Sequence, residues 1–327
     1  MTTKIKTGMK RVADNKNITL IFLVIAVVVL YQAINGSYLS SGNIRTLLGS
    51  ASVCGVLAVG LTCLMISGQI DLSSASVGCL GGVLLALMLS VGIPWPLALL
   101  FVVLFGALTG AIVAFFVNVL KIPSFITTIA VSSVYQGLAR FFSRGQSMSA
   151  GDASFWTLGD TLFDILPVPF LIMTVLFIVY GIVLSKTRSG RRVYICGGNS
   201  NAARLAGINT KKIHAILFIN NGAIAAFAGC LLAARMHSAT FSSVIGTDID
   251  ALTAIILGGV AFSGGKGSMV GSYIGLLLLN CFKNGLIGLR APTYWQIIAQ
   301  GLLFILALTV DYLREHALEK SLKAAKV

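Results

Sequence analysis

The sequence predicts an all-α integral membrane protein with about ten transmembrane helices, and three observations support this fold class. First, 57% of the 327 residues are hydrophobic and only 10% are charged, whereas soluble domains carry about 25% charged residues. Second, the mean hydropathy is +0.93. Third, the apolar residues gather in long runs whose central parts hold no Asp, Glu, Lys or Arg, as bilayer-spanning helices do. Together these observations argue against a soluble protein with a large core.

Ten apolar runs account for most of the chain, and most of them approach the roughly 20 residues that a helix needs to cross a hydrocarbon core of about 30 Å. The run at 251–265 is short and ends in Gly264-Gly265, so it also fits a half-helix or a re-entrant segment. The ten runs are 18–34, 51–68, 72–90, 95–118, 122–140, 166–184, 213–234, 251–265, 268–287 and 292–310.

The basic residues set the expected orientation. With the N-terminus inside, 18 of the 24 Lys and Arg residues fall on the inner side, as the positive-inside rule requires. Seven of them lie in the loop at 186–212, which has no acidic residue. We therefore expect a cytoplasmic tail at 1–17, a transmembrane domain at 18–312 with its loop at 185–212 in the cytoplasm, and a cytoplasmic tail at 313–327. The first run follows basic residues as a signal peptide would, but no A-x-A cleavage site follows it, so an uncleaved span is expected.

Cysteine and histidine form no recognisable site. The six cysteines lack C-x-x-C spacing, and five lie in apolar runs where a thiol acts as a small hydrophobe. The three histidines are scattered. We expect neither a metal site nor a catalytic group. The net charge of +14 is expected to orient the helices rather than to bind nucleic acid.

The two halves of the chain resemble each other weakly. Residues 70–82 and 247–259 each carry an Asp followed at the same spacing by Leu-Gly-Gly, and 121–130 and 290–299 share a Pro followed by Ile-Ala. Both pairs lie five runs apart. An odd number of spans per repeat forces opposite orientations, so we expect two inverted-topology five-helix repeats.

Asp71 and Asp248 stand at corresponding places in these two halves. Each is expected to cap the start of a helix, the third and the eighth, because a carboxylate accepts hydrogen bonds from free helix N–H groups. Direct contact with a transported solute is the alternative for both.

The loop at 186–212 contains a predicted two-turn helix at about 200–206. Gly197-Gly198 breaks the chain, Asn199 or Ser200 can cap the helix start, and Gly207 suits the position after its end. The helix would present a small apolar face that fits a groove of a partner protein. The alternative is a basic loop that only sets topology and touches lipid headgroups. The expected face consists of Ala202, Ala203, Leu205 and Ala206.

Four motifs follow one another along the chain: Gly68-Gln69-Ile70-Asp71-Leu72-Ser73, then Lys121-Ile122-Pro123-Ser124-Phe125-Ile126, then Gly197-Gly198-Asn199 with Ala202-Ala203-Arg204-Leu205 and Gly207-Ile208, and finally Leu257-Gly258-Gly259 with Ser263-Gly264-Gly265-Lys266-Gly267-Ser268. Together they resemble the permeases of sugar-type ABC importers, the ribose, xylose and galactose uptake systems, which are related more distantly to branched-chain amino acid permeases. The resemblance covers about 20–312.

Three positions depart from the pattern of this family. Gln69 stands where the family usually has Gly, Ser74-Ala75 replaces Val-Gly, and Ser200-Asn201 is often acidic in relatives. Gln69 adds a polar group to a turn that is normally bare, which weakens any transfer of substrate identity.

The resemblance implies a permease subunit of the bacterial cytoplasmic membrane whose loop at 185–212 docks on a separate ATPase with two nucleotide-binding domains. It also implies a second permease copy or paralogue and an extracytoplasmic solute-binding protein. ATP and Mg would bind to the ATPase, and no cofactor is expected on this chain. The coupling residues would be Gly197, Gly198, Asn199, Ala202, Ala203, Arg204, Leu205 and Gly207. The motif and cap residues would be Gly68, Gln69, Asp71, Ser73, Asp248, Asp250, Gly258, Gly259, Gly264 and Gly265.

The segment 263–268 is not a nucleotide-binding loop, although its Gly-Gly-Lys suggests one. That motif needs Gly where Val260 stands and Ser or Thr where Gly267 stands. We therefore expect a helix–helix turn there, and ATP hydrolysis on a partner chain.

Polar residues inside the runs are candidates for lining a solute pathway, because such residues are costly in a bilayer and usually face the protein interior. A set of neutral amide and hydroxyl side chains suits an uncharged, hydroxyl-rich solute. The family resemblance implies that this solute is a pentose or hexose. No carboxylate is expected inside the membrane, which argues against the alternative of a stand-alone secondary transporter or channel. The candidates are Asn118, Thr127, Thr128, Gln136, Asn220, Asn221, Asn280, Asn284, Gln296 and Gln300.

The solute-binding protein is expected to dock on the outer loops at 141–165 and 236–250. Five aspartates there would form an acidic rim: Asp152, Asp160, Asp164, Asp248 and Asp250.

Overall fold

The computed structural model describes residues 16–324, with side chains for 17–313, and it is almost entirely helical. The expected N-terminal tail at 1–17 therefore lies mostly outside the described residues. The helices are α2 (Lys16–Ile34), α3 (Ser41–Ile66), α4 (Ser74–Ser90), α5 (Trp95–Asn118), α6 (Ser124–Ser143), α7 (Ala153–Trp156), α8 (Val168–Lys186), α9 (Arg188–Gly198), α10 (Ser200–Leu205), α11 (Thr210–Met236), α12 (Thr247–Leu257), α13 (Met269–Gly288) and α14 (Thr293–Ala324), with a 3₁₀ turn η1 (Thr157–Gly159).

Seven helices of the described chain are long and apolar enough to cross a membrane: α2, α3, α5, α8, α11, α13 and α14. Every one of the ten predicted runs contains a helix, but α4, α6 and α12 fall outside this group. The 11 residues of α12 extend only about 16 Å, against a hydrocarbon core of about 30 Å. The interpretation of 251–265 as a half-helix is therefore closer to the structure than that of a full span. The chain is a multi-pass membrane protein.

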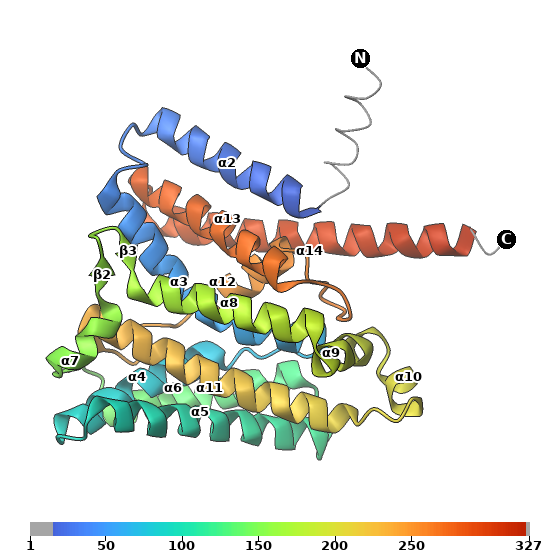
Figure 1. The fold of residues 1–327 in the computed structure, drawn as a ribbon, viewed down its shortest axis with the longest axis horizontal. Coiled ribbons are helices and arrows are strands. Elements are labelled where there is room, and N and C mark those ends of the chain that lie inside the picture. The colour runs from blue at the N-terminus through green and yellow to red at the C-terminus, as the bar shows by residue number, and fades with distance from the viewer. Residues whose placement is uncertain (1–15, 325–327) are drawn as a thin grey trace.

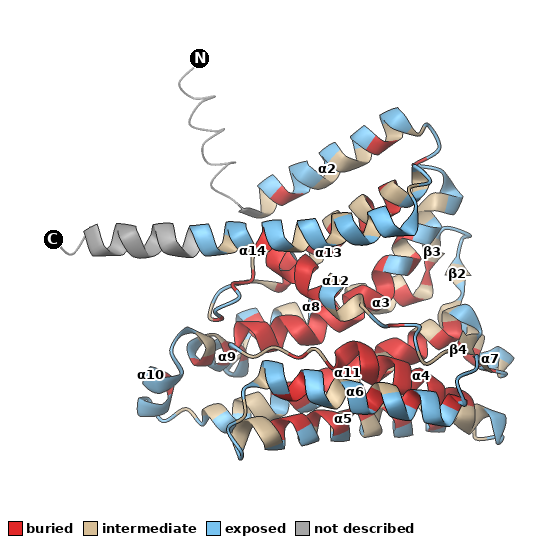
Figure 2. Ribbon diagram, turned by 180° about the vertical axis from the view of Figure 1, so that it is seen from behind, coloured by how far each residue is buried: buried red, intermediate tan, exposed pale blue. Residues whose placement is uncertain are grey.

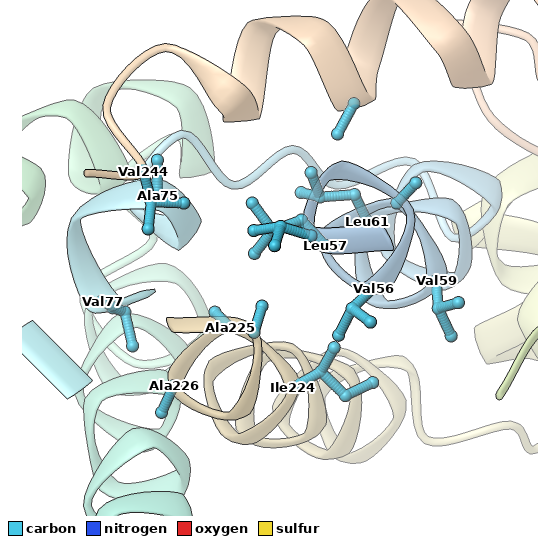
Figure 3. Packing of buried hydrophobic residues seen from close by; sticks show 14 of the residues in the cluster. Val56, Leu57, Val59, Leu61, Ala75, Val77, Ile224, Ala225, Ala226 and Val244 are labelled. Carbon is cyan, nitrogen blue, oxygen red and sulfur yellow. The ribbon is translucent and has the colours of Figure 1, made fainter. Parts of the chain in front are cut away.

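The core lies around α3, which is buried over most of its length. Helices α8, α11, α12 and α13 pack against it, and α3, α11 and α12 form much of the buried centre of the bundle, drawn red in Figure 2. Figure 3 shows Val56 of α3 pointing toward Ile224 of α11. Small residues bring α5 and α11 together, because Gly106 and Gly222 leave no room for a side chain on either helix. Close packing of small residues is how helices associate where no water drives them together.

The outer helices expose apolar surface. Helix α2 packs on α13, α14 contacts α12 and α13, and α6 packs on α4 and α5. The N-terminal end of α2 and the C-terminal end of α14 lie at the end of the bundle that carries α9 and α10 (Figure 1). The exposed apolar side chains on these helices are suited to lipid or to a second membrane subunit.

Four short strands join the loops at the opposite end of the bundle. Strand β1 (Met148–Ser149) pairs antiparallel with β4 (Ser238–Ala239), and β2 (Thr161–Leu162) pairs with β3 (Leu166–Pro167). Figure 1 shows β2, β3 and α7 at the end away from α9 and α10. The two loops at 141–165 and 236–250 therefore form one structure.

Candidate functional site

The loop at 185–212 holds two helices rather than one. Helix α9 was not expected from the sequence, and Gly197 and Gly198 are its last two residues rather than a break in the chain. The helical path breaks directly after them, at Asn199, one residue later than predicted. Thr187 begins α9, because its hydroxyl accepts a hydrogen bond from the Gly190 N–H at 3.1 Å. Glycine is tolerated at the end of α9 because other backbone segments pack against it, as described below.

The short helix after α9 is confirmed. Helix α10 spans Ser200–Leu205, and the Asn199 side chain caps it by accepting from the N–H groups of Asn201 and Ala202 at 3.1 and 2.9 Å. Gly207 follows its end with φ +77°, as a C′ glycine does. The sequence predicted these boundaries because capping chemistry is local.

The apolar face of α10 is smaller than predicted. Leu205 is 92% exposed, but Ala203 is fully buried, so the expectation that Ala203 lies on the outer face is wrong. Ala203 faces inward because α10 packs back on α9 and α11. The exposed residues Ala202, Leu205 and Ala206 form what we call the α10 knob.

Five glycines from three separate motifs meet at the end of α9, just before α10 begins, and we call this contact the glycine junction; it consists of Gly68, Gly197, Gly198, Gly264 and Gly265. A Cβ added at Gly264 would lie 2.8 Å from the Cα of Gly68, and one at Gly265 would lie 2.6 Å from the Cα of Gly198. A Cβ at Gly197 would overlap the Ile66 carbonyl oxygen. The end of α9, the end of α3 and the segment after α12 therefore touch through their backbones.

Hydrogen bonds hold the glycine junction together. The Gly265 N–H donates to the Ile66 carbonyl at 2.8 Å, and the Tyr194 hydroxyl of α9 donates to the Gly267 carbonyl at 2.9 Å. Gly264 and Gly265 have φ of +86° and +73°, which side chains rarely adopt. The sequence identified each of the three motifs, but it held no signal that they meet.

Asp71 lies inside the bundle and does not cap α4. The cap position belongs to Ser73, and the Ser73 N–H and hydroxyl donate to Asp71 Oδ1 at 2.8 and 2.6 Å. Asn221, near the middle of α11, donates to Asp71 Oδ2 at 2.8 Å. Asp71 is 2% exposed. The expectation of no carboxylate within the membrane is therefore wrong, because the non-helical segment 67–73 carries Asp71 in against α11.

Asp248 and Asp250 lie in the first turn of α12, whose cap position is Gly246. Asp248 therefore does not occupy the cap position, but its Oδ1 accepts a hydrogen bond from the Ile249 N–H of the first turn at 3.0 Å, as the capping prediction expected of this carboxylate. Asp250 forms an ion pair with Lys283 of α13. Of the five expected rim aspartates, Asp160 and Asp164 are exposed and the other three are half-buried.

The outer loops are rigidly connected. The Trp156 ring stacks on His237 with centroids 4.4 Å apart, and its indole N–H donates to the Ala150 carbonyl. Asp152 caps α7, and hydrogen bonds from Ser154 hold the pKa of its carboxyl below the usual range. This end of the molecule offers a shaped surface with two exposed carboxylates.

The ten polar residues expected along a pathway do not form one cluster. Thr127, Asn280 and Gln296 donate to nearby backbone carbonyls, those of Pro123, Leu276 and Ala291, at 3.1, 2.9 and 2.8 Å. Three others bridge elements: Asn118 donates to the Lys211 carbonyl at 3.0 Å, Asn284 accepts from Asn43 at 2.9 Å, and Asn220 accepts from Tyr180. Thr128 is buried against the Phe125 carbonyl, and Gln300 is half-buried.

Gln136 belongs to a small polar group between α4 and α6. Its amide donates to Ser76 Oγ at 3.1 Å and to Ser132 Oγ at 3.4 Å, and the two hydroxyls lie 2.6 Å apart. Ser133 beside them is exposed. Two glycines of the last motif have structural roles. Gly258 packs directly on Gly271 of α13, and Gly259 adopts a left-handed backbone conformation with φ +88°.

The sequence is similar to known permeases. A family model described as "Branched-chain amino acid transport system / permease component" matches residues 43–308. The Ribose import permease protein RbsC of Haemophilus influenzae is 33% identical, with 91% of this chain and 93% of the relative covered. RbsC of Escherichia coli strain K12 is 31% identical, with 91% and 93% covered. The Xylose transport system permease protein XylH of Haemophilus influenzae is 30% identical, with 91% and 96% covered. No solved structure matches.

Proposed function

Because the chain belongs to the family of permease components of branched-chain amino acid transport systems, we propose that it is the membrane-spanning permease of a binding-protein-dependent ABC importer for a simple sugar. The relatives named ribose import and xylose transport permeases favour a pentose or hexose. ATP and Mg bind to a partner ATPase with two nucleotide-binding domains. The importer lies in the bacterial cytoplasmic membrane.

The α10 knob on the glycine junction is the observation that carries this proposal. Leu205 offers an apolar side chain to solvent at the end of a well-capped helix, which is the form that a groove in a partner protein recognises. At the end of α9, which Asn199 alone separates from α10, backbone meets backbone without side chains that could absorb a displacement. A displacement of α10 is therefore transmitted to the C-terminal end of α3 and to the segment that follows α12.

The proposed topology has ten spans in two inverted five-helix repeats with both ends of the chain in the cytoplasm. The short helices α4 and α12 support it, because each follows a non-helical segment, 67–73 or 240–246. Discontinuous helices in corresponding positions of two repeats mark substrate sites in transporters. A second copy or a paralogue completes the pathway, and the solute-binding protein docks on the outer loops.

The pathway in this proposal runs along α6, where Gln136, Ser132 and Ser133 present amide and hydroxyl groups on a helix that packs only partly on α4 and α5. These groups match the hydroxyls of a sugar. Polar groups on a helix that is not enclosed by its own subunit would be costly in lipid. A second permease copy facing α6 would cover them.

A stand-alone secondary transporter or channel remains the alternative, and the buried Asp71 is the feature that favours it. Both carboxylate oxygens of Asp71 are already hydrogen-bonded to Ser73 and Asn221, which suits a structural carboxylate better than a proton carrier. Reconstitution of this chain alone in liposomes separates the two functions. Sugar uptake driven by a gradient without an ATPase would refute the importer proposal.

The proposal is tested by changing α10 in cells that carry the complete importer. Leu205→Asp and Arg204→Glu are expected to reduce uptake of labelled pentose or hexose by at least about tenfold, because the first adds a charge and the second reverses one where a partner groove would close. Ser200→Asp is the matched control, since it adds the same charge in the first turn of α10, where the helix dipole favours it. Full uptake by the Leu205 variant, with normal insertion, contradicts the docking role of the α10 knob.

A further inference from the structure

A cavity of about 680 Å³ lies between α8 and α11, and we call it the α8–α11 cleft. Both helices pack on α3, and Cys63 of α3 contributes to the lining. Helix α9 and the segment 206–209 line the end nearest to α10. Tyr180 and Asn220, whose hydrogen bond is described above, both line it.

The walls of the α8–α11 cleft are apolar and open toward the bilayer. Val183 of α8 and Ile216 of α11 line it and are 40% and 54% exposed. Both lie within helices that are long and apolar enough to cross a membrane. An occupant can therefore enter sideways from the lipid.

The end of the cleft near α10 is basic. Arg192 of α9 and Lys212 of α11 both line it, both are exposed, and no described lining residue is acidic. Basic pockets between transmembrane helices at the membrane surface bind the head groups of anionic lipids. The cations and the apolar walls together match a molecule with an anionic head and hydrocarbon chains.

A polar group lies deeper in the same cleft. Asn220 is eight residues beyond Lys212 on α11, which places it roughly 12 Å further along the helix axis. Its oxygen accepts from the Tyr180 hydroxyl, while its buried Nδ2 has no hydrogen-bond partner. A buried donor without a partner costs free energy, and an acceptor that enters the cleft would satisfy it.

We propose that the α8–α11 cleft binds an anionic glycerophospholipid, with its phosphate at Arg192 and Lys212, its chains between Val183 and Ile216, and an ester carbonyl available to Asn220. The lipid contacts α9 and the segment 206–209, so it stabilises the base of α10. In the proposed orientation of the chain, which is part of the proposed function, this lipid lies in the cytoplasmic leaflet; the preference for an anionic head does not depend on that orientation.

The experiment is native mass spectrometry of the full chain in detergent with phosphatidylglycerol, phosphatidylcholine or inorganic phosphate. Wild-type protein is expected to bind phosphatidylglycerol about 10- to 30-fold more tightly than phosphatidylcholine, because two cations face the head group. The double variant Arg192→Ala, Lys212→Ala is expected to lose this preference. The matched control is Arg191→Ala, Lys211→Ala, which removes two neighbouring cations that do not line the cleft.

A second variant tests the role of the apolar walls of the α8–α11 cleft. Val183→Trp fills the cleft from its exposed side and is expected to weaken binding of both lipids, while thermal unfolding verifies that the protein is folded. Equal lipid preference in wild type and the Arg192, Lys212 variant would overturn the proposal, and so would an equal loss in the control. Undiminished binding by Val183→Trp, or displacement of the lipid by inorganic phosphate, would show an anion site without a lipid and would also overturn it.

Discussion

Asn221 donates both to Asp71 Oδ2 and to Ser74 Oγ at 2.8 Å, and so joins the start of α4 to the middle of α11. The same residue lies against Gly60 of α3, where a side chain would overlap its amide oxygen. Three elements of the core are therefore fixed by one amide. In the interior of a membrane protein such a group has no water to replace a lost partner.

Replacing Asn221 with Leu is expected to destabilise the protein by about 1–3 kcal/mol, because the Asp71 carboxylate loses a buried donor. The measurement is thermal or denaturant unfolding in detergent. Asn280→Leu is the control, since Asn280 is also buried but donates only to the Leu276 carbonyl of its own helix. A loss as large for Asn280 as for Asn221 would contradict a special role for the Asp71 contact.

Two adjacent glycines in α9 give a sharp steric test of the glycine junction. Gly197→Ala is expected to lower stability by about 1–3 kcal/mol, because the new methyl group overlaps the Ile66 carbonyl. Gly198→Ala is expected to be neutral or to stabilise by up to about 1 kcal/mol, because a Cβ there meets nothing within 4 Å and alanine favours a helix. The measurement is the unfolding midpoint of each variant, and identical midpoints would rule out close backbone contact at Gly197.

Periodicity and capping chemistry predicted much of the fold, because both are local. The ten apolar runs each contain a helix, and Asn199 and Gly207 bound α10 as their residue types indicate. The exceptions depend on tertiary contacts. Asp71 resembled a cap in the sequence, and only the path of 67–73 brings it to Asn221. Helix α9 was missed because its Gly197-Gly198 end is allowed by backbones that arrive from Gly68 and Gly265.

The ion pair between Asp250 and Lys283 links the start of α12 to α13. Lys283→Met is expected to destabilise the protein by about 1–3 kcal/mol, since Asp250 then loses its partner and its Oδ1 already has none. Exchanging the two residues restores the pair only in part, because Lys at position 250 lies in the first turn of α12, where the helix dipole opposes a cation. A double-mutant cycle on unfolding free energies measures this coupling. A coupling energy of zero would show that the pair is screened by solvent.

Asp160 and Asp164 are the exposed carboxylates of the outer loops. If the solute-binding protein docks there, Asp160→Lys with Asp164→Lys is expected to weaken docking about 3- to 30-fold at low salt and less at high salt. Asp160→Asn with Asp164→Asn should give an intermediate loss. Surface plasmon resonance with the loaded binding protein measures both. An affinity that does not change with charge or salt would place the docking surface elsewhere.

The glycine junction is structurally independent of the α10 knob, so the backbone geometry of the one does not constrain the side chains of the other. The contacts among its five glycines are made by main-chain atoms, so the geometry of those contacts does not depend on side-chain rotamers. The α10 knob, by contrast, is formed by side chains alone. If α10 docks on an ATPase as proposed, exchange of Ala202, Leu205 or Ala206 would therefore retarget the permease to a different ATPase and leave the backbone contacts of the glycine junction unchanged.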